Sequence, residues 1–245
     1  MVPYSTWLSS GDNAWQMTAA TLVGLMSIPA LAVLYGGIVQ RKWAINTTMM
    51  VFCSFALTLI VWVLWAFKMG FGSAWIGTFI GKPGTVVGAS GEQAQAHIPL
   101  LNGLMPKFRI PQSSLVYFQF VFAAITPILF IGSVIGRIKF KVWLIFVPLW
   151  ITFAYAVNAF LLWGGGFWAG KGALDFSGGY VIHLAPACQA LSPLPWSGRG
   201  SSVIASGRCL TTCFSSRSAP AFSGWAGMGS TAATRTSLAL TPAPR

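Results

Sequence analysis

The chain has 245 residues, of which 55% are hydrophobic and only 7% are charged, and its mean hydropathy is +0.70. A soluble domain normally carries about 25% charged residues, so this composition excludes an ordinary water-soluble fold and indicates surfaces that face a lipid bilayer. The formal net charge of +12 would suggest nucleic-acid binding in a soluble protein. The basic residues instead form short clusters between apolar runs, which favours membrane topology and argues against a nucleic-acid partner.

Four apolar stretches are long enough to cross a bilayer, which takes about 20 residues. Each must be helical, because hydrocarbon offers no hydrogen-bond partner to an exposed backbone. Pro29 and Pro127 fall inside two of these stretches, where membrane helices tolerate proline as a kink. The sequence therefore predicts an all-α integral membrane protein. Its expected spans are residues 14–39, 44–71, 113–136 and 142–163.

The short connections predict the orientation of these spans. Arg41 and Lys42 follow the first span, and three further basic residues separate the third from the fourth: Arg137, Lys139 and Lys141. Basic residues in short connections favour the cytosolic side. We therefore expect the N-terminus outside, and the long connection at residues 72–112 outside as well.

A fifth span is expected to begin at residues 179–184, and the composition changes after it. Residues 185–245 hold no Asp, Glu or Lys, and their five arginines are scattered among Ser, Ala, Pro and Gly. Pro186, Pro193 and Pro195 argue against a continued membrane helix. GC-rich codons read out of frame give such a composition, so we favour an out-of-frame tail at 185–245. A disordered tail is the alternative.

One segment combines residue types that suit a small cation. Trp163 ends the fourth span, a Gly-rich turn follows with Asp175, and His183 lies one or two turns into the fifth span. An indole face attracts a cation by about 0.5–2 kcal/mol, and a neutral imidazole can accept or pass a proton. Taken singly, Trp163 is also explained as an interfacial belt residue and Asp175 as a helix N-cap. Their joint spacing favours a site.

Other chemistries have little support in the sequence. The cysteines at 188, 209 and 213 match no zinc spacing, so we expect no metal and no cofactor. The acids of the chain are Asp12, Glu92 and Asp175. They form no recognisable catalytic constellation, so we do not expect an enzyme.

At these residues the chain resembles the ammonium transporter family (the Amt/Mep/Rh superfamily), and plant members most closely. The resemblance covers residues 11–184, and its most specific part is the block from Asp175 to His183 with its spacing from Trp163. The supporting motifs are Gly11-Asp12-Asn13-Ala14-Trp15, Pro29 with Leu34-Tyr35-Gly36-Gly37, Phe118-Gln119 with Phe122-Ala123-Ala124-Ile125-Thr126, Phe146-Val147-Pro148-Leu149-Trp150, and Trp163-Gly164-Gly165-Gly166.

The resemblance implies an eleven-span fold, built as two inverted five-helix halves plus a last helix, and a homotrimer with one pore per subunit. It makes Trp163 the external indole that recruits the cation, flanked by Phe122. Phe118 lies four residues before Phe122, on the same helix face. Asp175 matches the acidic residue behind this site, and His183 matches the first of two pore histidines.

The implied function is transport of ammonium or ammonia, with methylammonium as a related substrate, across the plasma membrane. The cation would be recruited at an aromatic mouth, lose its proton and pass along a hydrophobic, His-lined pore. The chain departs from the family after Leu184, where the rest of the fifth span and the whole second half are missing. The alternative is therefore a truncated, non-transporting fragment that is inactive or interferes with full-length subunits.

Overall fold

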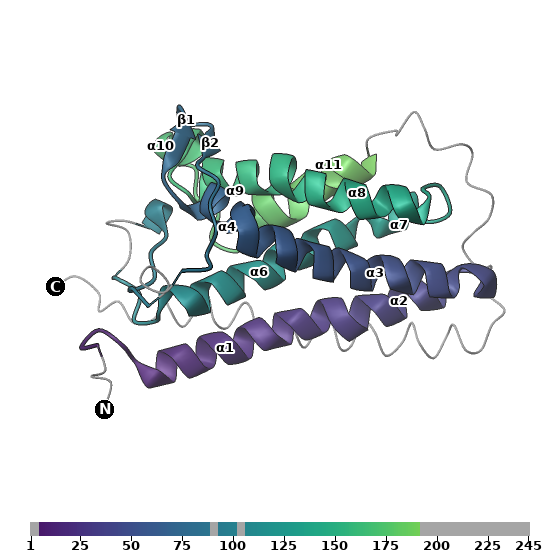
Figure 1. Cartoon of the computed structure of the whole chain (residues 1–245), viewed down its shortest axis with the longest axis horizontal. Helices are drawn as coiled ribbons and strands as arrows, with labels where there is room; N and C mark the ends of the chain where they lie inside the picture. Colours follow the sequence, from purple (N-terminus) through teal and green to yellow (C-terminus); the bar gives the residue numbers. More distant parts are fainter. Residues whose placement is uncertain (1–4, 89–92, 102–105, 192–245) are drawn as a thin grey trace.

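The computed structural model describes residues 5–88, 93–101 and 106–191. Figure 1 shows an elongated helical bundle whose long rods lie side by side along its long axis. The four predicted spans are confirmed, with ends that differ by a few residues except at the end of the fourth. The candidate membrane spans are Ser10–Ile38, Arg41–Phe71, Gln112–Val134 and Phe140–Gly170.

Each rod consists of consecutive helical segments, several joined by a π-helical turn. The first rod is α1 (Ser10–Leu25), η1 (Met26–Leu31) and α2 (Ala32–Ile38), and the second is α3 (Arg41–Val61), η2 (Trp62–Ala66) and α4 (Phe67–Phe71). The third is α6 (Gln112–Leu129) and α7 (Ile131–Val134), and the fourth is α8 (Phe140–Trp150), η4 (Ile151–Tyr155) and α9 (Ala156–Leu162).

Proline marks where two of these rods bend, as the sequence predicts. Pro29 lies in η1, where the backbone of Ile28 leaves the helical region (φ −132°, ψ 114°). Pro127 lies near the end of α6, which stops at Leu129. The carbonyl of Leu129 accepts a hydrogen bond from the Tyr35 hydroxyl at 3.0 Å. A neighbouring rod thus supplies the partner that the interrupted helix cannot.

The core is built around buried tryptophans between the rods. The first rod packs against α3 and α6, and α3 also packs against α8. Trp143 is fully buried, and its indole N–H donates to Ser54 Oγ at 2.8 Å and to the Met50 carbonyl at 3.2 Å. Trp62, also fully buried, donates to the Val116 carbonyl at 3.1 Å. These bonds satisfy polar groups that would otherwise be costly in an apolar interior.

The fifth helix extends beyond the point where the sequence indicates that it stops. η5 (Gly179–Leu184) continues into α11 (Ala185–Leu191), which contains Pro186. The helix therefore continues for five residues past Pro186, whereas the expectation that the three prolines together argue against a membrane-length fifth helix stays a prediction. The turn before Pro186 is π-wound, with the Ala185 N–H bonded to the Tyr180 carbonyl, and this wider turn moves carbonyls away from the proline ring. Residues 192–245, which hold Pro193, Pro195 and most of the predicted tail, lie outside the described residues.

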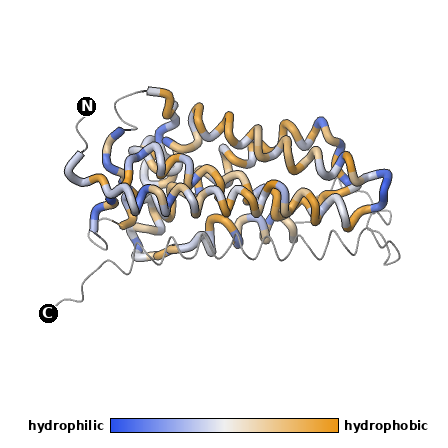
Figure 2. Tube along the Cα trace, turned by 90° about the horizontal axis from the view of Figure 1, so that it is seen from below, coloured by the Kyte–Doolittle hydropathy of each residue, from blue (hydrophilic) through white to orange (hydrophobic). Residues whose placement is uncertain are grey.

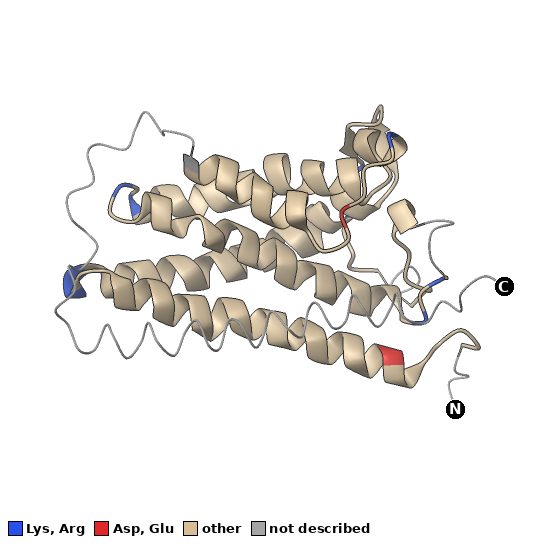
Figure 3. Ribbon diagram, turned by 180° about the vertical axis from the view of Figure 1, so that it is seen from behind, with Lys and Arg blue, Asp and Glu red and all other residues tan. Residues whose placement is uncertain are grey.

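The two ends of the bundle are polar and its length is apolar. Figure 2 shows hydrophobic colour along the rods and hydrophilic colour mainly at their ends. In Figure 3 the basic residues gather at the two ends, with those of the short connections at the end away from the N-terminus. The N-terminal end also carries a hairpin, β1 (Ala74–Ile76) with β2 (Ile80–Gly81), the short helix α10 (Phe167–Gly170) and the 3₁₀ turn η3 (Pro99–Leu101).

Candidate functional site

Trp163 lies directly after α9 and is held on two sides of its indole ring. Its Nε1–H donates to the main-chain oxygen of Asp175 at 2.7 Å. Its ring stacks on Phe71, at 5.9 Å between centroids and 19° between planes. Only 7% of Trp163 is exposed. The predicted recruitment residue is therefore a fixed, largely covered side chain in the described chain.

The Gly-rich turn after Trp163 fits closely among three other segments. A Cβ on Gly164 would lie 2.5 Å from the Gly70 carbonyl oxygen, and one on Gly166 would lie 2.9 Å from the Thr78 carbonyl oxygen. The Leu100 N–H of η3 donates to the Trp163 carbonyl at 3.1 Å. The glycines are thus required for close approach of backbones, and the turn is fixed by α4, the hairpin and η3 together.

Asp175 caps the start of the fifth helix with both carboxylate oxygens. Oδ1 accepts from the N–H groups of Gly178 and Gly179 at 2.7 and 2.8 Å, and Oδ2 from those of Tyr180 and Val181 at 3.0 and 3.2 Å. A helix start leaves its first N–H groups without internal partners, and a carboxylate there also interacts favourably with the helix dipole. Asp175 is 6% exposed. The helix-capping interpretation of this residue is thus confirmed, although the cap spans more residues than a single N-cap bond.

Phe118 and Phe122 meet on one face of α6. Their rings are 5.0 Å apart in an edge-to-face arrangement with an interplanar angle of 75°. Phe118 is buried and Phe122 is half-buried. The aromatic ring in contact with Trp163 is Phe71, so the structure does not bring Trp163 and Phe122 into ring contact within the described residues.

His183 lies in η5, two residues beyond Val181, the last residue that Asp175 caps. Its neighbours Val181 and Ile182 are buried, whereas Tyr180, His183 and Leu184 are exposed. The exposed positions continue at Ala187 and Cys188, a spacing that places all of them on one helix face. His183 is therefore presented on a face of the fifth helix that the rest of the described chain leaves uncovered.

Two contributors to the site were missed from the sequence. Phe71 was assigned only as the last residue of the second span, although its ring supports Trp163. Leu100 was assigned only to the external connection, although it is buried and donates to Trp163. Neither has a motif of its own; the proximity of Phe71 to Trp163 could have been suggested only by both residues ending spans on the same side. Among the described residues, no group of three His, Cys, Asp or Glu side chains could hold a metal ion.

Comparison with known proteins decides which family these elements belong to. The model of the Ammonium Transporter Family matches residues 14–198, three quarters of the chain. This chain belongs to the ammonium transporter family. The match extends beyond Leu184, which is the last residue of the resemblance based on sequence motifs.

Two similar curated proteins of the family come from plants. Ammonium transporter 2 of Arabidopsis thaliana is 50% identical over 192 residues, which covers 78% of this chain and 40% of the relative. Ammonium transporter 3 member 3 of Oryza sativa subsp. japonica is 49% identical over 201 residues, covering 78% of this chain and 42% of the relative. The chain thus spans about 40% of the length of the curated relatives that it matches.

Solved structures of the family show the same fold. The Mep2 mutant delta442 from Candida albicans superposes with a TM-score of 0.72 and 25% identity, covering 95% of this chain and 53% of that one. Candida albicans Mep2 itself gives a TM-score of 0.71 at 24% identity, covering 93% and 49%. Together with four helices long and apolar enough to cross a membrane, these comparisons make this ammonium transporter family member a multi-pass membrane protein.

Proposed function

We propose that this chain forms the first half of a transmembrane pathway for ammonium or ammonia, and that it works when the remaining part of the family fold supplies the opposite wall. One observation carries the proposal. Asp175 accepts the Trp163 indole N–H with its main chain and caps the helix of His183 with its carboxylate. The three residues expected to act on the substrate therefore belong to one connected unit.

In this proposal Trp163, stacked on Phe71, supplies the recruiting surface. Phe118 and Phe122 contribute a separate aromatic pair on α6, without ring contact to Trp163. An indole attracts a desolvated cation by about 2 kcal/mol or more, and the buried carboxylate of Asp175 adds negative potential without contacting the ion. Moving an ion through an apolar interior is costly. Loss of the ammonium proton beyond the mouth, with His183 as the first polar group of the pore, removes that cost. This is transport and not catalysis.

The same proposal covers location and assembly. Basic residues in the two short connections lie at the end away from the N-terminus (Figure 3), which favours a cytosolic location for that end and an external N-terminus. The plant ammonium transporters to which the chain is similar support ammonium as the substrate. Methylammonium as a related substrate and the plasma membrane as the location follow from the family resemblance alone. The family resemblance further implies a homotrimer.

A specific observation favours the second candidate function, a non-transporting fragment. The face of the fifth helix that holds Tyr180, His183 and Leu184 is exposed, so within the described residues a pore lined by His183 would be open on that side. A chain in this state inserts and either stays inactive or binds full-length subunits without transporting.

Uptake of ammonium and methylammonium tests the two candidates. The chain alone is compared with a fusion in which the C-terminal part of the Arabidopsis relative follows residue 184. We expect uptake from the fusion only. Replacement of Trp163 by Leu in the fusion should change uptake and the ammonium/methylammonium ratio, whereas Trp168→Leu, an exposed indole at the same end, should leave both unchanged.

Each outcome of this comparison has a definite meaning. Identical uptake of both substrates by the fusion and its Trp163→Leu variant would remove the recruitment role of Trp163. Uptake by the chain alone would show that the second half is not required. A dose-dependent fall in uptake when the chain is expressed with a full-length relative would support the interfering fragment.

A further inference from the structure

An exposed aromatic surface lies at the N-terminal end of the bundle, at the outer side of the Gly-rich turn that follows Trp163. It is formed by the β1–β2 hairpin and α10, which lie together at one corner in Figure 1. Trp75, Phe79 and Trp168 are 59%, 54% and 51% exposed. We call this surface the aromatic platform; its residues are Trp75, Ile76, Phe79, Phe167 and Trp168.

The platform is a built surface and not a set of loose side chains. Phe79 stacks on Phe167 at 5.3 Å and 18° between planes, and Phe167 meets Trp168 edge-to-face at 5.1 Å. The Phe167 N–H donates to the Thr78 carbonyl at 2.8 Å. These contacts join two segments far apart in the sequence and fix the rings of Phe79, Phe167 and Trp168 relative to one another.

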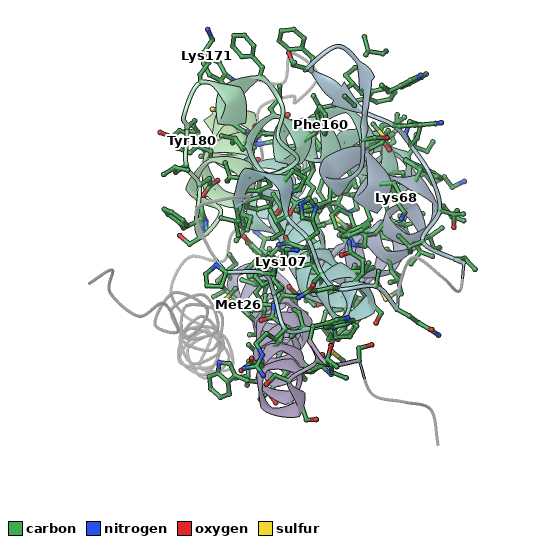
Figure 4. The ribbon with its side chains drawn as sticks, turned by 90° about the vertical axis from the view of Figure 1, so that its left-hand side faces the viewer. Met26, Lys68, Lys107, Phe160, Lys171 and Tyr180 are labelled. Atoms are coloured by element: carbon green, nitrogen blue, oxygen red, sulfur yellow. The ribbon has the colours of Figure 1, made fainter. Side chains whose placement is uncertain are left out.

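The platform carries positive charge. The Lys171 ammonium lies 5.8 Å from the centroid of the Phe167 ring, and Figure 4 shows Lys171 at the outer edge of the molecule. Lys82 follows β2 directly and is exposed. The acids of the described residues are Asp12, at the start of α1, and Asp175, whose oxygens are committed to backbone N–H groups. The partner of this surface is therefore expected to present apolar and anionic groups together.

The length of the second rod places the platform at the depth of lipid headgroups. Arg41–Phe71 spans 31 residues, which at about 1.5 Å per residue gives about 46 Å. The hydrocarbon core is about 30 Å thick and the bilayer with headgroups about 40–45 Å. With Arg41 and Lys42 at the opposite interface, the hairpin that begins at Ala74 falls within the headgroup layer.

The platform also lies at the end of two apolar stripes. One runs along α8 and η4, where Val142, Ile145, Leu149 and Phe153 are exposed at helical spacing. The other runs along α3 through Ile45, Met49 and Phe52. Such outward stripes on membrane helices face acyl chains, and the rods that carry them lead into α10 and the hairpin.

We propose that the aromatic platform is an interfacial anchor that sits in the phospholipid headgroup layer on the N-terminal side of the membrane. The rings of Trp75, Phe79 and Trp168 contact the upper acyl chains and glycerol region, where aromatic side chains are favoured. Lys82 and Lys171 contact the lipid phosphates above them. The anchor fixes the depth of the hairpin and α10, and it requires neither substrate nor transport.

Quenching of tryptophan fluorescence tests this inference on the whole chain in phosphatidylcholine vesicles. The emission of Trp75 and Trp168 is obtained as the difference between the chain and its Trp75→Leu/Trp168→Leu double variant, with circular dichroism to confirm that the variant remains folded. The quenchers are a nitroxide on the lipid headgroup and iodide in the water. We expect the difference emission to be quenched by the headgroup nitroxide and shielded from iodide.

A second arm isolates the lysines. Adding phosphatidylglycerol should increase headgroup quenching for the chain and for a Lys82→Arg/Lys171→Arg variant, and this increase should be lost in Lys82→Gln/Lys171→Gln. Three results overturn the proposal. Quenching by iodide alone shows a water-facing surface. Shielding from both quenchers shows a surface covered by protein. An equal increase in headgroup quenching for the Lys82→Gln/Lys171→Gln variant shows that the lysines do not contact lipid phosphates.

Discussion

The indole N–H of Trp163 and the main-chain oxygen of Asp175 are joined by a 2.7 Å hydrogen bond. The side chain of the same aspartate binds four N–H groups at the start of the fifth helix. The end of the fourth span and the beginning of the fifth are therefore one mechanical unit. A change at either residue should be felt at the other.

Replacing Trp163 by Phe should loosen the start of the fifth helix. Phenylalanine can keep the stack on Phe71 but cannot donate to Asp175, and a lost hydrogen bond of this kind costs about 1 kcal/mol. Hydrogen exchange of the amides of residues 178–182, measured on the chain in detergent, should become faster. Trp168→Phe is the matched control, since it changes an exposed indole at the same end. Equal exchange in both variants would contradict the coupling.

Removing the carboxylate of Asp175 should be more damaging. Asp175→Ala leaves four N–H groups without an acceptor; those of Gly178 and Val181 belong to buried residues, and each buried unsatisfied group costs about 1–3 kcal/mol. We therefore expect the start of the fifth helix to be strongly destabilised. Asp175→Asn retains one oxygen acceptor and should lie between Ala and the parent. Thermal unfolding, monitored by circular dichroism, ranks the stability of the parent and the two variants. Equal unfolding temperatures for Asp175→Asn and Asp175→Ala would show that the charge of Asp175, and not its hydrogen bonds to the helix start, determines the stability of the protein.

The sequence was sufficient to predict the four spans, because a long apolar run in lipid can satisfy its backbone hydrogen bonds only as a helix. It was not sufficient for Asp175, because a carboxylate before a helix is compatible with a cap and with an ion site, and only the position of its oxygens identifies the cap. It did not indicate that the helix includes Pro186, since the proline penalty assumes a regular α-helical turn, and the preceding turn is π-wound. The expected frame change at 185 stays a prediction; the described helix continues to Leu191.

Gly178 offers a test of local geometry. Its φ is +83°, and an added Cβ would lie 2.2 Å from Ile182 Cδ1. Gly178→Ala should therefore combine backbone strain, about 1 kcal/mol or more, with a clash inside the capped turn. Gly172 has φ +84° with nothing within 4 Å of the added Cβ, so Gly172→Ala carries the strain alone. The unfolding temperature should fall further for Gly178→Ala than for Gly172→Ala. An equal fall would show that the Ile182 side chain moves away from the added Cβ without loss of stability.

The uncovered face of the fifth helix can be mapped with thiol reagents. In a chain whose native cysteines are replaced by serine, Tyr180→Cys and His183→Cys should react rapidly with a water-soluble maleimide. Ile182→Cys should react slowly, because Ile182 is buried. The rates are measured by mass shift in detergent. Equal rates at 182 and 183 would contradict the assigned face, whatever the transport activity of the chain.

The surroundings of Trp163 show what the sequence could not supply. The ring of Phe71 and the N–H of Leu100 reach Trp163 from segments that lie far from it in the chain. Their positions depend on the packing of a hairpin and a 3₁₀ turn within a long external connection, and no apolar period or motif encodes that packing. The sequence therefore named candidate residues, whose roles stay predictions, but not the scaffold that holds Trp163.

The contact between the hairpin and the Gly-rich turn also imposes an order on synthesis. The Thr78 carbonyl receives the Phe167 N–H, but Phe167 follows about 90 residues later in the chain, which at about 5–20 residues per second takes on the order of ten seconds. During that interval Phe79 lacks the Phe167 ring on which it stacks. The hairpin and α10 can therefore form their joint surface only after two further spans have been synthesised.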